Sequence, residues 1–427
     1  MYLNFQVKGT PPLMKAFLQR NKDHFTYLGL MMIVLGLPLS RAMMSIGIFV
    51  LVLVALFQQN FKQRFIQFFT ITPFLAIVAF YFLVVISGLW SSDTPAYFKA
   101  VRIKLPFLLL PISLFVLLPI QQKGFVIVLK TYLWIIVLSS LWSLFYLFMN
   151  FSEITASYGY GKVLITPTNH IRFSLMVVMA IIVGYYLLKQ KIIDLPWKKS
   201  ITIIAIFYLV VFLHLLAVRS GLLAFYTIAL ILTLLYVVET KSYMVLGLMT
   251  ISLAAVITLG VNFSPTLNMK YRYMKYELEN YFSGNYNIVG SDGRRLLSIR
   301  SGIEVGNNNK LLGVGYGDVK KATHSMYSLL FPDIPEENKK LPHNQWVYIY
   351  AGLGLTGLLL FIVSFFLPLF YRDAWKNVLV LGISVITFTS FFSEYTFETQ
   401  VGVTFYTFFL LVPFCIHLHE SKLKMSN

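Results

Sequence analysis

Long, uninterrupted apolar runs constrain this chain more than any other feature of its sequence. Several of them reach about 20 residues, the length that an α-helix needs to cross the hydrocarbon core of a bilayer. The 427-residue chain is 58% hydrophobic and only 12% charged, with a mean hydropathy of +0.73. Soluble domains carry roughly 25% charged residues, and the alternating pattern of a membrane β-barrel is not seen. The sequence therefore predicts an all-α polytopic membrane protein.

We expect about twelve spans of this kind. They divide the chain into an N-terminal transmembrane bundle of about nine spans (1–262), a long loop with amphipathic helices (263–342), and a C-terminal part with about three spans (343–427). The expected cores of the spans are 26–40, 42–58, 65–90, 105–120, 124–149, 169–188, 200–218, 220–238, 242–262, 345–370, 377–393 and 400–418.

Lysine and arginine indicate the orientation. If both termini are cytoplasmic, the cytoplasmic segments carry more Lys and Arg than the short segments on the other side, as the positive-inside rule requires. The loop 263–342 then faces outward. The net charge of +18 follows in part from this arrangement, since basic residues commonly face the anionic headgroups of membrane lipids, and no nucleic-acid motif is present. The single cysteine, Cys415, lies in the last span and is expected to be inert packing.

An arginine opens the sixth expected span, in LITPTNHIRFSLMVV (164–178). Thr168 or Asn169 is expected to cap this helix, which puts Arg172 in its first turns. The partial positive charge of a helix N-terminus and the full charge of Arg172 would together suit an anion at the membrane surface. The alternative is that Arg172 simply reaches the lipid headgroups.

A second arginine lies between the seventh and eighth expected spans, in LLAVRSGLLAF (215–225). Almost no loop separates these spans, so we expect Arg219 to be held in one place between packed helices, with Gly221 easing the turn. His214 lies about one helical turn away and is expected to be a hydrogen-bonded packing residue rather than a catalyst.

The loop 263–342 is long enough to form structure of its own. PTLNMKYRYMKYELENYF (265–282) predicts an amphipathic helix lying at the membrane interface, with an apolar stripe formed by Tyr271, Met274, Leu278 and Tyr281 or Phe282. A second helix is expected to start at Ser291 or Asp292 and to end near Gly306, presenting Arg294, Arg295 and Arg300. The glycine-rich LLGVGYGD (311–318) lacks the context of a nucleotide-binding loop. We expect it to let the backbone approach another segment closely.

Two polar residues, His343 and Asn344, stand at the mouth of the span 345–370. The glycines beyond them, Gly352, Gly354 and Gly357, are expected to let neighbouring helices pack closely. The last outward turn carries Glu394 and Glu398, which are either exposed polar residues or partners for the arginines. The histidines and acids do not form a spaced set of metal ligands, so the sequence predicts no required metal and no cofactor.

These motifs resemble those of the O-antigen ligase superfamily, whose members include O-antigen ligases, O-antigen polymerases and O-linked oligosaccharyltransferases of bacterial envelopes. That family tends to show an arginine opening a loop helix, a G-V-G-x-G turn, and H-N or H-S before a span with G-x-x-G-L. Arg295, LLGVGYGD, His343-Asn344, and Gly354 to Leu358 match this order, and VRSG around Arg219 matches a further motif. The chain departs from the pattern at Ile299, where an aromatic residue is common, and at Lys310, where proline is common.

The resemblance implies a glycosyl transfer on the periplasmic face of the bacterial inner membrane, with a glycan on undecaprenyl pyrophosphate as donor. The acceptor is a hydroxyl of lipid A–core in ligases, a second carrier-linked glycan in polymerases, and a protein Ser or Thr in oligosaccharyltransferases. The long loop followed by H-N favours the ligase.

The residues suit that chemistry, because fixed guanidinium groups stabilise the charge that develops on a departing pyrophosphate without a metal. Arg219 and Arg295 are the candidate catalytic cations, and Arg172 is a further phosphate-binding candidate. His343 is the candidate for activating or orienting the acceptor hydroxyl, since histidine exchanges its proton near neutral pH. Asn344 would cap its helix or bind a sugar. Arg294 and Arg300 are further candidates for substrate binding.

Two other function classes compete with an enzyme. A transporter of the same carrier lipid would place polar residues near the middle of the bilayer, whereas the arginines here stand at the mouths of the spans. A non-catalytic partner in envelope synthesis would use the arginines only to contact headgroups.

Overall fold

The computed structural model describes residues 17, 19–151, 164–193, 195–245, 247–248, 250–251, 265–286 and 290–426. These residues form helices joined by turns and loops, without strands. The predicted all-α architecture is therefore confirmed. The α-helices are α2 (Lys22–Leu39), α3 (Arg41–Leu56), α4 (Phe61–Phe68), α5 (Thr72–Ile86), α6 (Thr94–Lys104), α7 (Pro106–Leu117), α8 (Gln122–Met149), α10 (His170–Lys189), α11 (Pro196–Leu216), α12 (Arg219–Thr240), α14 (Pro265–Phe282), α15 (Ser291–Asn308), α16 (Val319–Leu330), α17 (Gln345–Phe370), α18 (Val378–Ser390) and α19 (Gln400–Ser426).

Eight helical segments among the described residues are long and apolar enough to cross a membrane. They are 72–89, 94–117, 122–149, 170–189, 196–216, 219–240, 345–376 and 400–418, and the bent pair of α3 and α4 would make a ninth. This is fewer than the twelve that hydropathy predicts. The difference lies in short helices and in one gap: α18 has 13 residues, roughly 20 Å at 1.5 Å per residue, and the span expected at 242–262 lies mostly outside the described residues.

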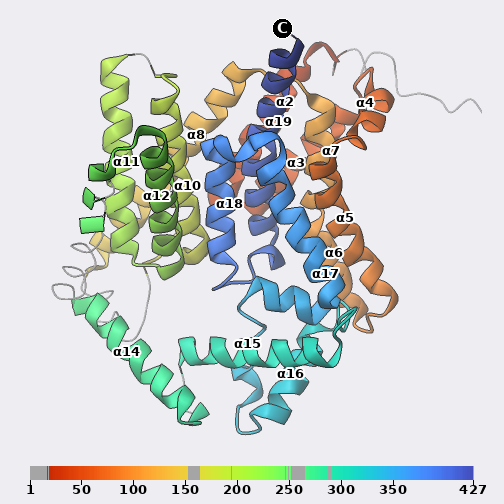
Figure 1. Cartoon of the computed structure of the whole chain (residues 1–427), viewed down its shortest axis with the longest axis vertical. Helices are drawn as coiled ribbons and strands as arrows, with labels where there is room; N and C mark the ends of the chain where they lie inside the picture. The colour runs from red at the N-terminus through yellow and green to blue at the C-terminus, as the bar shows by residue number, and fades with distance from the viewer. Residues whose placement is uncertain are drawn as a thin grey trace, which may run out of the picture.

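The helices form a bundle with α19 running through its interior (Figure 1). Most of α19 between Gln400 and Leu418 is buried, as is most of α10. Phe408, Phe409, Leu410 and Val412 of α19 are completely or almost completely inaccessible, and Cys415 is fully buried, as expected from the sequence. The helix is apolar on all sides because it has bundle neighbours on all sides.

The helices α14, α15 and α16, from the segment 265–342, lie at the end of the bundle opposite the C-terminus (Figure 1). Both helices expected there form: α14 spans the predicted residues, and α15 begins at Ser291. A small core of Leu297, Tyr327, Phe331 and Ile334 joins α15 to α16 and the turn that follows it. In Figure 1, α15 lies across the ends of the bundle helices rather than along them.

The sequence predicts one continuous helix over 345–370, but α17 breaks at Gly354, whose φ of 64° and ψ of −161° lie outside the helical region. Only glycine adopts this conformation without strain. The break frees backbone groups, and the glycine-rich segment 311–318 bonds to them: Val314 N–H donates to Ala351 C=O at 3.0 Å and Gly315 N–H to Gly352 C=O at 2.9 Å. The expected close backbone approach of this segment is thus confirmed, and its partner is the break in α17.

A second set of contacts fixes the other side of the glycine-rich segment. Asp318 accepts hydrogen bonds from the backbone N–H groups of Ser92 and Asp93, at 2.6 and 2.9 Å, and from the Ser92 hydroxyl at 2.8 Å. Burial alone would raise the pKa of Asp318, but these hydrogen bonds outweigh it and lower the pKa below its usual range. The segment is therefore held between the start of α6 and the middle of α17.

Candidate active site

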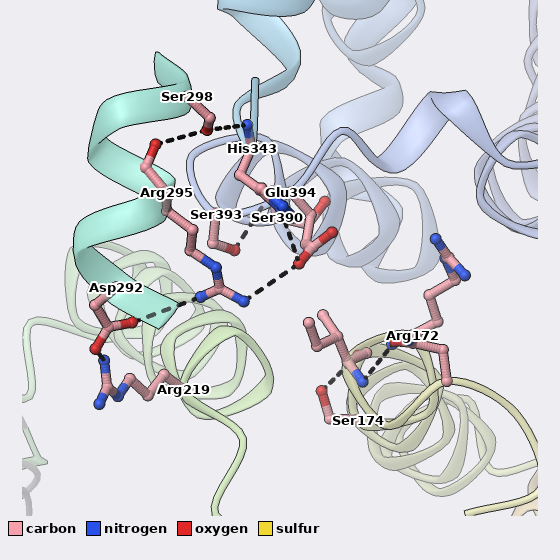
Figure 2. A network of polar contacts seen from close by, with 12 residues as sticks. Arg172, Ser174, Arg219, Asp292, Arg295, Ser298, His343, Ser390, Ser393 and Glu394 are labelled. Atoms are coloured by element: carbon pink, nitrogen blue, oxygen red, sulfur yellow. Dashed lines mark hydrogen bonds and ion pairs between the residues drawn. The ribbon is translucent and has the colours of Figure 1, made fainter. Parts of the chain in front are cut away.

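The span mouths that carry the candidate residues meet at one end of the bundle. α10 and α12 begin there, α18 ends there, and α15 crosses beside them (Figure 1). Five side chains from these elements form what we call the charged cluster: Arg219, Asp292, Arg295, Glu394 and His343 (Figure 2). The charges of Arg219, Asp292, Arg295 and Glu394 alternate along it, and His343 lies next to Glu394.

Arg219 is fixed by the tight turn between α11 and α12. Ala217 adopts a left-handed conformation with φ 50°, and α12 begins two residues later at Arg219 itself. The Arg219 Nη1 donates to Asp292 Oδ2 at 2.6 Å. Its neighbour His214 contacts the Val210 carbonyl at 2.8 Å and the Tyr226 hydroxyl at 2.6 Å, so it is a packing residue as predicted.

α15 supplies the centre of the cluster. Its first turn is capped by the buried Glu277 of α14, whose carboxylate accepts from the N–H groups of Asp292 at 2.6 Å and Gly293 at 2.8 Å. Such a carboxylate stabilises the positive end of the helix dipole. Arg295 lies one turn further on, with Nη1 3.9 Å from Asp292 Oδ1 and Nη2 3.5 Å from Glu394 Oε1.

The other two arginines of α15 point elsewhere, because successive helical residues are rotated by about 100°. Arg300 is exposed and lies over the ring of Phe331 at 5.6 Å, in the small core of the loop. Tyr327 donates to the backbone carbonyl of Arg294. Among the described residues, Arg295 forms ion pairs within the charged cluster, whereas Arg294 and Arg300 form none there. The substrate-binding roles of Arg294 and Arg300 stay predictions.

His343 is the last residue of the cluster and lies next to Glu394. Its backbone N–H donates to Ser298 Oγ at 3.1 Å, and Ser298 is on the same face of α15 as Arg295. Its Nδ1 lies 3.8 Å from Glu394 Oε1 and is buried without a hydrogen-bond partner among the described residues. The imidazole packs against the ring of Tyr395, with centroids 5.0 Å apart. Burial and the nearby Glu394 raise the pKa of the Tyr395 hydroxyl, which keeps it a neutral phenol.

The residues that follow His343 anchor it. Asn344 caps α17, since its side chain accepts from the Val347 N–H at 3.1 Å. This confirms the capping function expected as one alternative for Asn344. The next residue, Gln345, is fully buried, and its side chain both donates to Glu398 at 3.1 Å and accepts from the Phe397 N–H at 2.7 Å. The mouth of α17 is thus joined to the turn that carries Glu394.

Glu398 accepts contacts from several of the elements around this turn. It forms a 2.6 Å ion pair with Lys104, whose side chain is completely buried, and it accepts from the Tyr316 hydroxyl at 2.6 Å. The Lys104 ammonium also lies 4.2 Å from the centre of the Tyr316 ring. One carboxylate therefore joins α6, the glycine-rich segment, α17 and the turn before α19.

Arg172 stands on the other side of Glu394 from Arg295 (Figure 2). Asn169 caps α10, as the sequence predicts, and accepts from the Ile171 N–H at 3.0 Å. None of the ion pairs in the described part of the chain involves Arg172, although Glu394, Tyr395 and Arg41 act on it electrostatically. The guanidinium is thus near the cluster without being neutralised by direct pairing.

Sequence reasoning identified Arg219, Arg295 and His343 as site residues, gave Glu394 as a possible arginine partner, and missed the role of Asp292. Asp292 was expected only as a helix start. Glu394 was expected as an exposed residue or an arginine partner, and the second alternative is confirmed. The rarity of acidic residues could have pointed to both acids. The chain holds only 17 acidic residues against 35 basic ones, so an acid close to a span mouth is expected to pair with one of several nearby cations.

Comparison with known proteins supports the motif-based interpretation. Residues 204–362 match the family model described as O-antigen ligase. This range runs from α11 into α17 and contains Arg219, Asp292, Arg295 and His343. A search of curated proteins found no match. Members of the matched family are membrane enzymes that transfer glycosyl groups. The resemblance seen in the motifs is therefore confirmed over residues 204–362 of this membrane protein, which are similar to the O-antigen ligase family.

Proposed function

We propose that the protein is an O-antigen ligase, which transfers a glycan from undecaprenyl pyrophosphate to a hydroxyl of lipid A–core. The single observation that carries the proposal is the charged cluster, in which two arginines and a histidine from distant parts of the chain meet at one end of a membrane bundle. A reaction between a lipid-linked donor and a membrane-anchored acceptor needs its catalytic groups at the membrane surface.

The arginines would stabilise the leaving group. Breaking the bond between the sugar and the pyrophosphate concentrates negative charge on the phosphate oxygens. Arg219 and Arg295 both contact Asp292 on one side, and both side chains remain partly exposed to an incoming ligand. Removal of one such fixed contact costs roughly 10²–10³ in rate in well-studied enzymes. Arg172 would add charge from the far side of Glu394.

His343 would accept the proton of the acceptor. In the proposed step the acceptor oxygen forms a bond to the anomeric carbon, the bond from that carbon to the pyrophosphate oxygen breaks, and the hydroxyl proton passes to Nε2. Glu394 faces Nδ1 at 3.8 Å and would stabilise the imidazolium that results. This arrangement of a base and an acid that orients it recurs in enzymes that activate hydroxyl groups.

Several further features belong to the proposal. The charged cluster would face the periplasm from the inner membrane, both termini would be cytoplasmic, and twelve spans would be reached if α2, α3, α18 and the segment 242–262 also cross. The reaction would need no metal, because arginine carries its charge permanently. Glycan transfer by the purified protein should accordingly persist in excess EDTA, and a loss that added Mg²⁺ restores would refute metal independence.

The acceptor is tested by deleting the gene and separating envelope glycolipids on a gel. If the protein is a ligase, deletion should remove long glycan from lipid A–core and let it accumulate on the carrier. Complementation with the His343→Ala variant should then fail to restore long glycan on lipid A–core. Single repeat units on the core would instead indicate a polymerase. An unchanged ladder would contradict both, and transfer to protein would then be tested by looking for glycosylated Ser or Thr.

A further inference from the structure

The arginines of the charged cluster are already paired with an acid, Asp292, which lies in α15 and not in a candidate span. Asp292 places one carboxylate oxygen 2.6 Å from Arg219 and the other 3.9 Å from Arg295. The Asp292 side chain is 17% exposed, whereas those of Arg219 and Arg295 are 50% and 34% exposed. The arginines can therefore be reached from solvent while an internal anion occupies part of their donor sites.

A carboxylate and a phosphate group are recognised by arginine in the same way, through N–H groups that point at two oxygens. Most of the backbone donors at this end of α15 are already occupied. The N–H groups of Asp292 and Gly293, which a helix N-terminus would offer to a phosphate, are bound to Glu277 instead. A phosphate that binds the arginine side chains at this end of α15 meets Asp292 there.

We propose that Asp292 competes with the pyrophosphate of the carrier lipid for Arg219 and Arg295. Its carboxylate pairs with Arg219 and Arg295 while the site is empty, yields Arg219 when a pyrophosphate binds, and takes it back when the product leaves. This inference rests on the proposed function. Its consequence is that the protein binds polyprenyl pyrophosphate more weakly than its arginines would allow, which favours release of the product.

The competing interpretation is that Asp292 only positions the arginines. The two make opposite predictions for Asp292→Asn, which keeps the shape of the side chain and removes its charge. A competitor predicts tighter binding, by about two- to fivefold, the amount that a partly exposed ion pair is worth. A positioning residue predicts weaker binding, because the arginines lose the contact that holds them.

The experiment measures the affinity of the purified full-length protein for a short-chain polyprenyl pyrophosphate by titration calorimetry in detergent. Asp333→Asn is the matched control: it removes the same charge from an exposed position in the same loop, outside the cluster. We expect Asp292→Asn to lower the dissociation constant two- to fivefold and Asp333→Asn to leave it unchanged. Asp292→Ser is the second variant, should the first fail to fold.

The outcomes separate this inference from the proposed function. If the wild type binds the pyrophosphate but not the corresponding polyprenol, and Asp292→Asn binds equally or more weakly, the competitor role is refuted and the proposed function stands. If the wild type does not distinguish the pyrophosphate from the polyprenol, the proposed function itself is contradicted.

Discussion

Replacement of Glu398 by alanine should destabilise the protein strongly. The substitution leaves the Lys104 ammonium without its 2.6 Å partner, in a position with no exposed side-chain surface. It also removes the acceptor for the Tyr316 hydroxyl and the Gln345 amide. Breaking a buried ion pair on one side costs about 3–5 kcal/mol. Taking ~2 cal/mol/K per residue for the entropy of unfolding, the 427 residues convert this to a fall of about 3–6 °C in the unfolding midpoint.

The chain provides its own reporter for this measurement. Cys415 is the single cysteine and is fully buried, so a thiol-reactive dye should label the detergent-purified protein only as it unfolds on heating. The matched control is the double variant Lys104→Met with Glu398→Gln, which removes both charges together. Buried pairs replaced in this way are often neutral or stabilising, so the double variant should melt closer to the wild type than Glu398→Ala does.

A midpoint for Glu398→Ala within error of the wild type would refute this reasoning, because it would mean that water or another group solvates Lys104. A double variant as unstable as the single one would show that the cost comes from lost packing rather than from an unpaired charge. The result also bears on function, since Gln345 follows His343 and Asn344 directly and joins their helix to Glu398.

Three further predictions follow from single positions. Gly354→Ala should cost about 1–3 kcal/mol, because its positive φ is strained for alanine; an unchanged midpoint in the same dye assay would argue against the break in α17. The contribution of Asp318 to stability should be present above its unfolded pKa of about 3.9 and lost as the pH falls through its lowered pKa, so Asp318→Asn, which lacks the charge that receives the Ser92 hydrogen bonds, should show less acid sensitivity than the wild type. Glu394→Gln should slow transfer by at least tenfold, a part of the roughly 10²–10⁴ that general base catalysis supplies, and should change the pH dependence of transfer; a parallel loss at every pH would mean that Glu394 acts through Arg295 or packing and not through His343.

The sequence was most informative where charge is rare. Arg219 and His343 stand at the mouths of apolar spans, Arg295 lies near the start of a loop helix, and the predicted topology puts all three at the same end of the bundle. Their location at a common end could be predicted from spacing and hydropathy. An arginine in a two-residue connection between spans, such as Arg219, must lie at the ends of those spans.

Other features depend on long-range contacts that periodicity does not encode. Lys104 lies 294 positions before its partner Glu398, and it reads as an ordinary basic residue before an apolar run. The break at Gly354 depends on hydrogen bonds from the glycine-rich segment, so the local sequence alone predicts an unbroken helix. The rotation of α15 decides that Arg295 enters the cluster and that Arg300 does not, and that rotation is set by the small core on its other face.

Reconstituted transfer tests the central claim most directly. The purified protein would be mixed with a glycan on undecaprenyl pyrophosphate and with lipid A–core, and the product would be followed by its shift on a gel. The account predicts a new glycan–lipid A–core band with the wild type, its loss with His343→Ala, and a strong reduction with Arg295→Lys. Lysine keeps the positive charge but loses the planar set of N–H donors that can bind two phosphate oxygens at once. Transfer by His343→Ala at the wild-type rate, or no transfer by a folded wild type supplied with both substrates, would contradict it.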